Sequence, residues 1–206
     1  VVPRPIGWIS TVDSQGRHNL APYSQFQNVT FNPPIVMFSA NQNTGGQRKD
    51  SVRNAEETGE FVWNMATYAL RDAVNKSAEE LPHGVDEFEH AGLVKLPSRK
   101  VKPMRVAGSP IQFECVYLNT LRFPGVPPMG TADVVFGRVV AIHIDDDVID
   151  GQGMLDILKI QPLARMGYFD YTFVDNKFEM VIGGNNSALL AGLEDSPDKA
   201  KAAAQR

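Results

Sequence analysis

"SPIQFECVYLNTLRF" (residues 109–123) and "ADVVFGRVVAIHID" (residues 132–145) are the two stretches that decide the fold. Both are rich in β-branched and aromatic residues and alternate in polarity, which is the pattern of β-strands. Each is longer than an average strand, and the turn-forming segment "PGVPPMGT" joins them. They predict a long, bent hairpin, in which Gly137 marks a β-bulge or a barrel corner.

Three shorter stretches extend this β pattern toward the N-terminus. They are "IGWISTV" (residues 6–12), "PIVMFSA" (34–40) and "EFVWNM" (60–65), each bounded by Gly, Pro, Asn or Asp. The segment "VDSQGRHN", which follows the first of them, has the Asp, Ser and Gly of a hairpin turn. The N-terminal part of the chain is therefore predicted to form antiparallel strands.

Two helices are predicted between the strands. The first lies in "DSVRNAEETGEF", with Asp50 or Ser51 as its N-cap and Gly59 as its C-terminal stop. The second covers residues 68–81 and ends at Pro82. Its apolar face comprises Leu70, Ala73, Val74, Ala78 and Leu81.

Strands outnumber helices and do not alternate regularly with them. This argues against a Rossmann or TIM-barrel topology and predicts a mainly β fold, a barrel with helices packed outside. We expect residues 1–206 to form a single domain, since nothing in this length requires a second core. The polar, Ala-rich tail "EDSPDKAKAAAQR" (194–206) is expected to be a terminal helix or frayed chain without a core.

The composition excludes several classes of function. A net charge of −4 argues against a nucleic-acid surface, so a local basic cluster would have to bind something small. No apolar run approaches the roughly 20 residues that span a bilayer, and no signal peptide is visible, so a cytoplasmic protein is expected. The single Cys115 lies in a strand-like run and is expected to be a buried or half-buried thiol. The chain starts with Val1 in mid-pattern, which suggests that part of the natural N-terminus is missing.

Histidines and nucleophiles give no metal or hydrolytic site. His18, His83, His90 and His143 are scattered, and "HGVDEFEH" (83–90) has the composition of a solvated loop rather than the spacing of a zinc site. No G-x-S-x-G elbow is present. His143 is expected to be a satisfied core histidine, with a position near a nicotinamide as the alternative.

The stretch "NTGGQRKDS" (43–51) has the residues of an anion-binding loop. Its glycines let backbone N–H groups approach a ligand, a helix follows directly, and Arg48, Lys49 and Ser51 supply cations and a hydroxyl. The spacing is not that of a P-loop, because Asp50 intervenes before Ser51. A phosphomonoester fits these groups, and the alternative is a solvated turn that merely caps the helix.

The preceding segment, "NLAPYSQFQNVTFNPP" (19–34), interleaves small polar residues with Tyr23, Phe26 and Phe31. Such a segment offers backbone donors to the edge of a flat heteroaromatic ring and apolar area to its faces. The alternative is an edge strand with a proline-stiffened exit.

Three stretches together resemble the flavin reductase-like family of FMN-binding split-barrel proteins, which includes flavoredoxins and the reductase components of two-component monooxygenases. They are "PRPIGWISTVDSQGRHNLAPYSQFQNVTFNPPIVMFSA", "KDSVRNAEETGEFVWNM" and "PLARMGYFDY". The resemblance implies a split β-barrel of Greek-key-like topology, a homodimer, and FMN in a cleft near the dimer interface.

The resemblance also implies a set of FMN-binding residues. The isoalloxazine and ribityl wall would be formed by Pro22, Tyr23, Ser24, Phe26 and Asn28. The end of the next strand would line the same cleft with Ser39, Ala40 and Asn41. The phosphate would meet the "KDS" motif, Lys49, Asp50 and Ser51, with Asp50 organising the backbone. Two further positions are weaker candidates: Trp8 beside the flavin or in the core, and Arg165 near the partner's flavin or in an ion pair.

The implied activity is hydride transfer from NAD(P)H to flavin, carried out by the cofactor rather than by a catalytic side chain. No G-x-G-x-x-G fingerprint is present, so loose nicotinamide binding is expected. One alternative is a flavoredoxin-type electron carrier that a protein partner reduces. Another is a flavin-binding protein without redox turnover. A reductase or a flavoredoxin-type carrier would have a monooxygenase or an electron-transfer protein as its partner.

Overall fold

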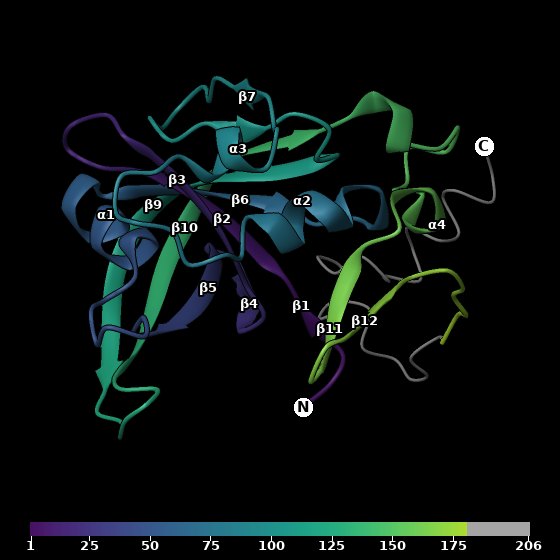
Figure 1. Cartoon of the computed structure of the whole chain (residues 1–206). Helices are drawn as coiled ribbons and strands as arrows, with labels where there is room; N and C mark the ends of the chain where they lie inside the picture. Colours follow the sequence, from purple (N-terminus) through teal and green to yellow (C-terminus); the bar gives the residue numbers. More distant parts are fainter. Residues whose placement is uncertain (181–206) are drawn as a thin grey trace.

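The two long strands lie at the centre of a seven-stranded antiparallel sheet in the computed structural model, which describes residues 1–180 (Figure 1). Strand β9 (Ile111–Phe123) pairs with β10 (Ala132–Ile144) as a hairpin of 13 residues on each side. The remaining strands are β2 (Gly7–Val12), β3 (His18–Tyr23), β4 (Phe26–Phe31), β5 (Pro34–Asn41) and β6 (Glu60–Met65). The predicted hairpin and N-terminal strands are confirmed.

The order of the strands makes the sheet curl. It runs β3-β2-β6-β9-β10-β5-β4, so β3 and β4 lie at opposite edges although only Ser24 and Gln25 separate them in the chain. The two edges must therefore approach each other at this junction. The Ser39 N–H of β5 donates to the Gln25 carbonyl at 2.8 Å, which continues the β4–β5 ladder by one step beyond the Phe26–Phe38 pair. Because β3 and β4 do not pair, the barrel stays open between them.

Smaller elements surround this barrel. A three-stranded sheet contains β1 (Arg4–Pro5), β11 (Leu163–Gly167) and β12 (Asp170–Phe173), and a two-stranded one contains β7 (Lys95–Leu96) and β8 (Arg105–Val106). The helices are α1 (Asp50–Thr58), α2 (Arg71–Lys76), α3 (Glu87–His90) and α4 (Ile157–Ile160), with 3-10 turns η1 (Tyr68–Leu70) and η2 (Asp146–Val148). Figure 1 shows these helices outside the main sheet, so the predicted mainly β fold is confirmed. No helix among residues 1–180 is long and apolar enough to cross a membrane.

Gly137 lies at an irregular point of the central hairpin, as predicted. The register of β9 and β10 shifts between Phe136 and Gly137 and again between Val139 and Ala141. A Cβ atom on Gly137 would lie 2.3 Å from the ring of the fully buried Phe61. The glycine is therefore needed because an aromatic ring packs directly against its backbone.

The helices differ in part from the prediction. Helix α1 ends at Gly59 as expected, with a left-handed φ of 76°, but its N-cap is Lys49 rather than Asp50 or Ser51. The second helix was predicted too long, because α2 already ends at Lys76. The Ser77 hydroxyl donates to the Val74 carbonyl at 3.0 Å and accepts the Trp8 indole N–H at 2.9 Å. These contacts fix Ser77 at the helix end, and the chain turns away there.

The interpretation of "HGVDEFEH" as a solvated loop is wrong. The Asp86 carboxylate caps α3 by accepting the Phe88 N–H at 2.9 Å, and the Phe88 ring is fully buried. Cys115 is fully buried, as predicted. The predicted tail, residues 194–206, lies outside the described residues.

The buried Glu114 carboxylate holds the loop that joins β7 to β8. It accepts the N–H groups of Arg99 (2.8 Å), Lys100 (2.6 Å) and Val101 (3.2 Å), and His143 Nε2 lies 2.5 Å from it. Burial alone would raise the pKa of Glu114, but the hydrogen bonds from these backbone N–H groups and from His143 outweigh it and lower the pKa. His143 thus has a hydrogen-bond partner, as the first of the two predicted alternatives requires, but it is only partly buried and does not lie in the core.

Glu114→Gln is expected to lower the free energy of unfolding by roughly 2 kcal/mol at pH 7, because an amide NH₂ would replace an acceptor of backbone N–H groups. Since the folded-state pKa is below the unfolded value, the carboxylate stabilises the fold above the unfolded pKa, and this stability is lost as pH falls through the folded pKa. The difference between wild type and variant should therefore shrink below about pH 4.5. Urea denaturation at pH 7 and at pH 3.5 measures it. A constant difference would contradict the assigned charge.

Candidate functional site

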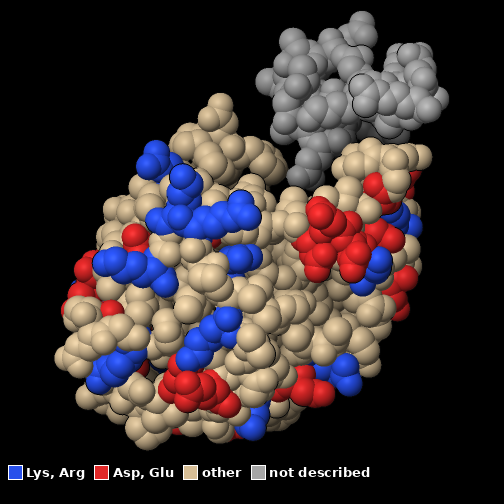
Figure 2. Space-filling model, turned by 90° about the horizontal axis from the view of Figure 1, so that it is seen from above, with Lys and Arg blue, Asp and Glu red and all other residues tan. Residues whose placement is uncertain are grey.

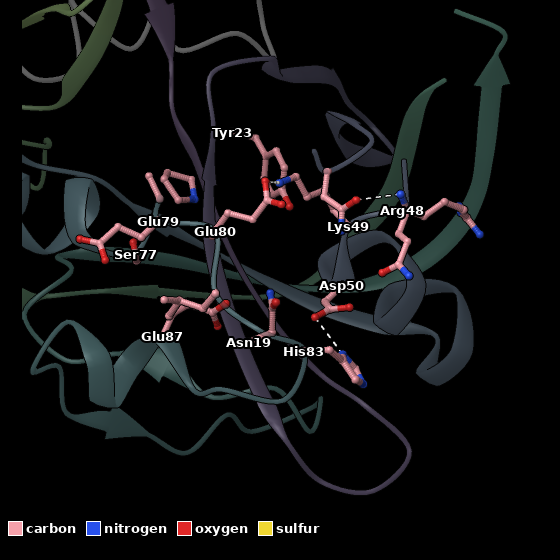
Figure 3. Close-up of a pocket in the computed structure, with 16 residues that line it drawn as sticks. Asn19, Tyr23, Arg48, Lys49, Asp50, Ser77, Glu79, Glu80, His83 and Glu87 are labelled. Atoms are coloured by element: carbon pink, nitrogen blue, oxygen red, sulfur yellow. Dashed lines mark hydrogen bonds and ion pairs between the residues drawn. The ribbon is translucent and has the colours of Figure 1, made fainter. Parts of the chain in front are cut away.

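A cleft of about 150 Å³ lies beside the N-terminus of α1 (Figure 3). Its walls come from β3, from the loop before α1 and from the segment that follows α2. The lining residues are Asn19, Ala21, Pro22, Tyr23, Asn43, Gln47, Arg48, Lys49, Asp50, Ser77, Ala78, Glu79, Glu80, Leu81, His83 and Glu87. Parts of the predicted anion loop and of the predicted flavin wall thus face the same space.

The N-terminus of α1 carries no side-chain cap. Its N-cap residue is Lys49, whose side chain cannot accept a hydrogen bond from the first helical N–H groups, and no side-chain cap is present among residues 1–180. Ser, Thr, Asp or Asn usually supplies that acceptor. Backbone hydrogen bonds close the preceding loop, from Asn43 N–H to the Gln47 carbonyl (2.8 Å) and from Gly46 N–H to the Asn43 carbonyl (3.0 Å). The loop therefore places a lysine and an uncapped helix end, both favourable to an anion, at the cleft.

Of the two cations in this loop, Lys49 is the more available. Arg48 forms two short ion pairs, from Nη2 to Glu56 (2.6 Å) and from Nε to the buried Asp133 (2.8 Å). The hydrogen bond to Glu56 is the main cause that raises the pKa of Arg48, which stays charged and engaged. Lys49 Nζ instead lies 3.6 Å from Glu80, and both side chains are partly exposed. Of the two cations expected in the loop, only Lys49 is thus free of a short ion pair with the described residues.

The Ser51 hydroxyl is buried and is not freely accessible to a ligand. The residue is 1% exposed, and its hydroxyl accepts the Asn19 side-chain N–H at 2.8 Å. Tyr23 is also buried, with its ring 5.2 Å from that of Phe38, and burial raises the pKa of its phenol. Asn19 and Ser51 form a polar floor between β3 and α1.

Asp50 is paired with a histidine that lies 33 positions further along the chain. His83 Nδ1 lies 2.9 Å from Asp50 Oδ2, and Arg17 Nη2 lies 2.9 Å from His83 Nε2 (Figure 3). Because arginine can only donate, Nε2 must accept, and Nδ1 carries the proton that is donated to Asp50. Asp50 therefore ties the segment after α2 to the start of α1.

Glu87 forms a hydrogen bond with the edge strand β3. Its carboxylate accepts the Leu20 N–H of β3 at 2.9 Å, which satisfies a donor on the open edge of this strand. Burial raises the pKa of Glu87. This wall of the cleft is thus made of acidic side chains that already have partners.

The other predicted site residues do not line this cleft. The Phe26 ring is buried and stacks on Trp63 at 5.3 Å between centroids, while Asn28 is exposed on the edge strand β4. The Ser24 hydroxyl accepts hydrogen bonds from Arg4 at 3.2 and 3.3 Å. The predicted residues of β5, Ser39, Ala40 and Asn41, lie at the end of that strand paired with β10.

The two weaker candidates have other surroundings. Trp8 is fully buried in the core, the second of its predicted alternatives. The guanidinium of Arg165 lies over the Tyr171 ring at 4.7 Å, and Nη1 donates to the Tyr171 hydroxyl at 2.6 Å. Its Nε is buried without a hydrogen-bond partner among the described residues. Arg165 therefore does not reach the cleft of its own chain.

Two further hollows lie away from α1. One of about 350 Å³ lies between α2 and the β11–β12 hairpin, and it is lined by aromatic residues that include Phe169, Tyr171 and Phe173. Another, of about 400 Å³, has Arg99, Arg105 and His143 in its wall. Figure 2 shows Lys and Arg side chains grouped on part of the surface despite the negative net charge. Within residues 1–180 no group of three or more His, Cys, Asp or Glu side chains could hold a metal.

Sequence reasoning missed the segment that forms the outer wall of the cleft. Ser77, Glu79, Glu80 and His83 follow α2 and carry no motif, and the segment around them was expected to be helix or solvated loop. Their contacts with the loop before α1 span more than 30 positions of the chain, so no local pattern could have revealed them.

Comparisons with known proteins support the resemblance. Residues 1–173 match the family model described as "Flavin reductase like domain". An uncharacterized protein of Aquifex aeolicus is 34% identical over 182 residues, which cover 87% of this chain and 90% of the relative. The expected resemblance is therefore confirmed over nearly the whole described chain.

Solved structures show the same architecture. Component B of nitrilotriacetate monooxygenase from Bacillus cereus superposes with a TM-score of 0.81 at 31% identity, covering 87% of this chain and 88% of that one. A split-barrel-domain protein from Shewanella frigidimarina gives a TM-score of 0.74 at 19% identity, covering 87% and 86%. The predicted split-barrel fold is confirmed.

Proposed function

We propose that this chain, which belongs to the flavin reductase-like family, binds FMN and transfers a hydride from NAD(P)H to flavin. The observation that carries the proposal is the uncapped N-terminus of α1 with Lys49 at its N-cap, open to a cleft that continues along Pro22 and Tyr23. The anion for which this end is suited is the 5′-phosphate of FMN.

Some residues of the cleft would contact a phosphorylated flavin directly, and others would support those residues. Lys49 and the first N–H groups of α1 would hold the phosphate, and Asp50 would keep the loop in place through His83. Ser51 would act through the backbone of the first helical turn and through Asn19, because its hydroxyl is buried and engaged. The walls of Pro22 and Tyr23 would face the ribityl chain and the ring.

The remaining predicted residues would complete the ring site from the open side of the barrel. Ser24, Phe26 and Asn28 would contribute mainly backbone groups, since the Phe26 ring packs in the core. Ser39, Ala40 and Asn41 lie at the end of β5, where the Ser39 N–H donates to the carbonyl of Gln25 at the junction between β3 and β4. We propose that this junction, rather than any single side chain, positions the isoalloxazine edge.

FMN supplies the redox chemistry when bound, and the chain binds and orients it. Backbone N–H groups along the wall would favour the negative charge that develops on the ring edge. We assign no side chain of the cleft as an acid or a base, because the flavin would carry the hydride transfer; the Glu79 and Glu87 carboxylates contact His90 and the Leu20 N–H.

Steady-state oxidation of NADH and NADPH, with and without added FMN, tests the activity. A reductase oxidises at least one of the nucleotides, and its rate rises with free FMN. A flavoredoxin-type carrier, the alternative, oxidises neither by itself but is reduced by a protein donor. Absence of oxidation together with partner-dependent reduction would replace the reductase by the carrier.

We further propose a homodimer formed from one domain per chain, residues 1–206. Large apolar side chains stay exposed in the single chain on β4 and on the outer half of β9, including Phe31 (63%), Leu121 (47%) and Phe123 (53%). Burial in a partner subunit would remove them from water. Because a relative is a monooxygenase component, a monooxygenase or electron-transfer protein is the proposed partner, and the single free thiol suits a reducing, cytoplasmic location.

A further inference from the structure

The donors of the loop before α1 already hold an anion that belongs to the chain. The Glu80 carboxylate accepts the Thr44 hydroxyl at 2.6 Å and the Thr44 N–H at 3.2 Å, and it lies 3.6 Å from Lys49 Nζ. Figure 3 shows Lys49 and Glu80 pointing toward each other across the cleft. A hydroxyl, a backbone N–H and an ammonium are donors from which a bound phosphate accepts hydrogen bonds.

This carboxylate is charged at neutral pH. The hydrogen bond from the Thr44 hydroxyl is the main cause that lowers the pKa of Glu80, with further contributions from the Thr44 N–H and from Lys49. The Glu80 side chain is 40% exposed, so it can turn out into water without breaking the fold.

We propose that Glu80 is an internal competitor for the phosphate of FMN and that it keeps the flavin exchangeable. The inference rests on the function proposed above. A phosphate that approaches Lys49 must displace the Glu80 carboxylate from Thr44 and Lys49, and the displaced carboxylate remains close enough to repel it. Part of the attraction of the loop for the phosphate is thereby cancelled.

The consequence concerns the kinetic class of the protein. A loop with free donors would hold FMN as a tightly bound group, whereas a loop with a competing carboxylate releases it faster. Release is what a protein needs if it hands reduced flavin on to another enzyme. Glu80 therefore favours flavin as a substrate over flavin as a permanent cofactor.

The test compares FMN and riboflavin binding to the purified full chain by fluorescence titration, together with FMN dissociation by stopped flow. Glu80→Gln is expected to tighten FMN binding by about tenfold, mainly through slower dissociation, and to change riboflavin binding by less than about twofold, because riboflavin has no phosphate. Glu80→Ala should act in the same direction. Glu57→Gln, which removes the same charge from the exposed face of α1, is the matched control.

Each outcome decides the inference. Selective tightening for FMN in the Glu80 variants supports it. Unchanged or weaker FMN binding in those variants, with FMN bound by the wild type, overturns the inference and leaves the proposed function standing. Equal tightening in Glu57→Gln overturns it in favour of a general charge effect. Failure of wild type and variants alike to bind FMN overturns the proposed function and this inference with it.

Discussion

Replacing Lys49 and Ser51 together by alanine is expected to weaken FMN binding by roughly 2 to 4 kcal/mol, which is about 30-fold to 1000-fold. Lys49 is the cation of the loop that is not committed to a buried ion pair, so its loss removes the main charge for the phosphate. Loss of the Ser51 hydroxyl leaves the Asn19 amide without its acceptor and loosens the first turn of α1. Titration of the variant with FMN, followed by fluorescence, measures the effect.

Riboflavin is the internal control for this variant. It lacks the phosphate, so its affinity should change much less than that of FMN. Lys102→Ala removes a lysine from the exposed loop after β7, outside the cleft, and should leave FMN binding within about twofold of wild type. If the double variant retains FMN as wild type does, the phosphate does not bind at this loop.

Gly137→Ala is expected to lower the free energy of unfolding by about 3 kcal/mol. The new methyl group would lie 2.3 Å from two atoms of the Phe61 ring and 3.2 Å from the Cys115 Cβ. Phe61 is fully buried and packs edge-on against Phe38, so its ring has no free space to move into. Urea denaturation of the purified protein measures the difference.

Two further variants show whether the clash is the cause. Gly151→Ala places a methyl group where no atom lies within 4 Å, and it should change stability by less than about 0.5 kcal/mol. Phe61→Leu in the Gly137→Ala background should cost less than the sum of the two single changes, because it removes the ring that clashes. Wild-type stability of Gly137→Ala would show that the hairpin shifts to accommodate the methyl group.

The fold was predictable where one local pattern sufficed. The alternation in residues 109–123 and 132–145 and the turn between them specify a hairpin, and β9 and β10 pair in that way. Gly59 ends α1 because its φ of 76° suits a residue without a side chain. In each case the residues that decide the structure are neighbours in the sequence.

The prediction failed where distant residues decide. The apolar spacing in residues 68–81 continues past Lys76, yet the helix ends there, because Ser77 accepts a hydrogen bond from Trp8, 69 positions away. In "HGVDEFEH" the polar composition concealed Phe88, which is buried in a core formed with Trp8 and Val106. Tertiary packing overrides local composition at both places.

The candidate site shows the same division. Lys49 and Asp50 were identified from a short motif and lie in the cleft, as do Pro22 and Tyr23. The ion pairs of Arg48 with Glu56 and Asp133 could not be read from the sequence, since Asp133 lies 85 positions away. The same holds for Glu80 at Thr44. A sequence motif supplies the donors of a site, and only the fold shows which of them are already engaged.

The central claim is that FMN, bound in the cleft beside α1, accepts a hydride from a reduced nicotinamide nucleotide. The most direct test is an anaerobic absorbance spectrum of the protein reconstituted with FMN, recorded before and after addition of NADH and then of NADPH. The account predicts that the oxidised-flavin band bleaches with at least one nucleotide and that the Lys49→Ala, Ser51→Ala variant needs far more FMN for the same signal. A bound flavin that stays oxidised with both nucleotides would contradict it.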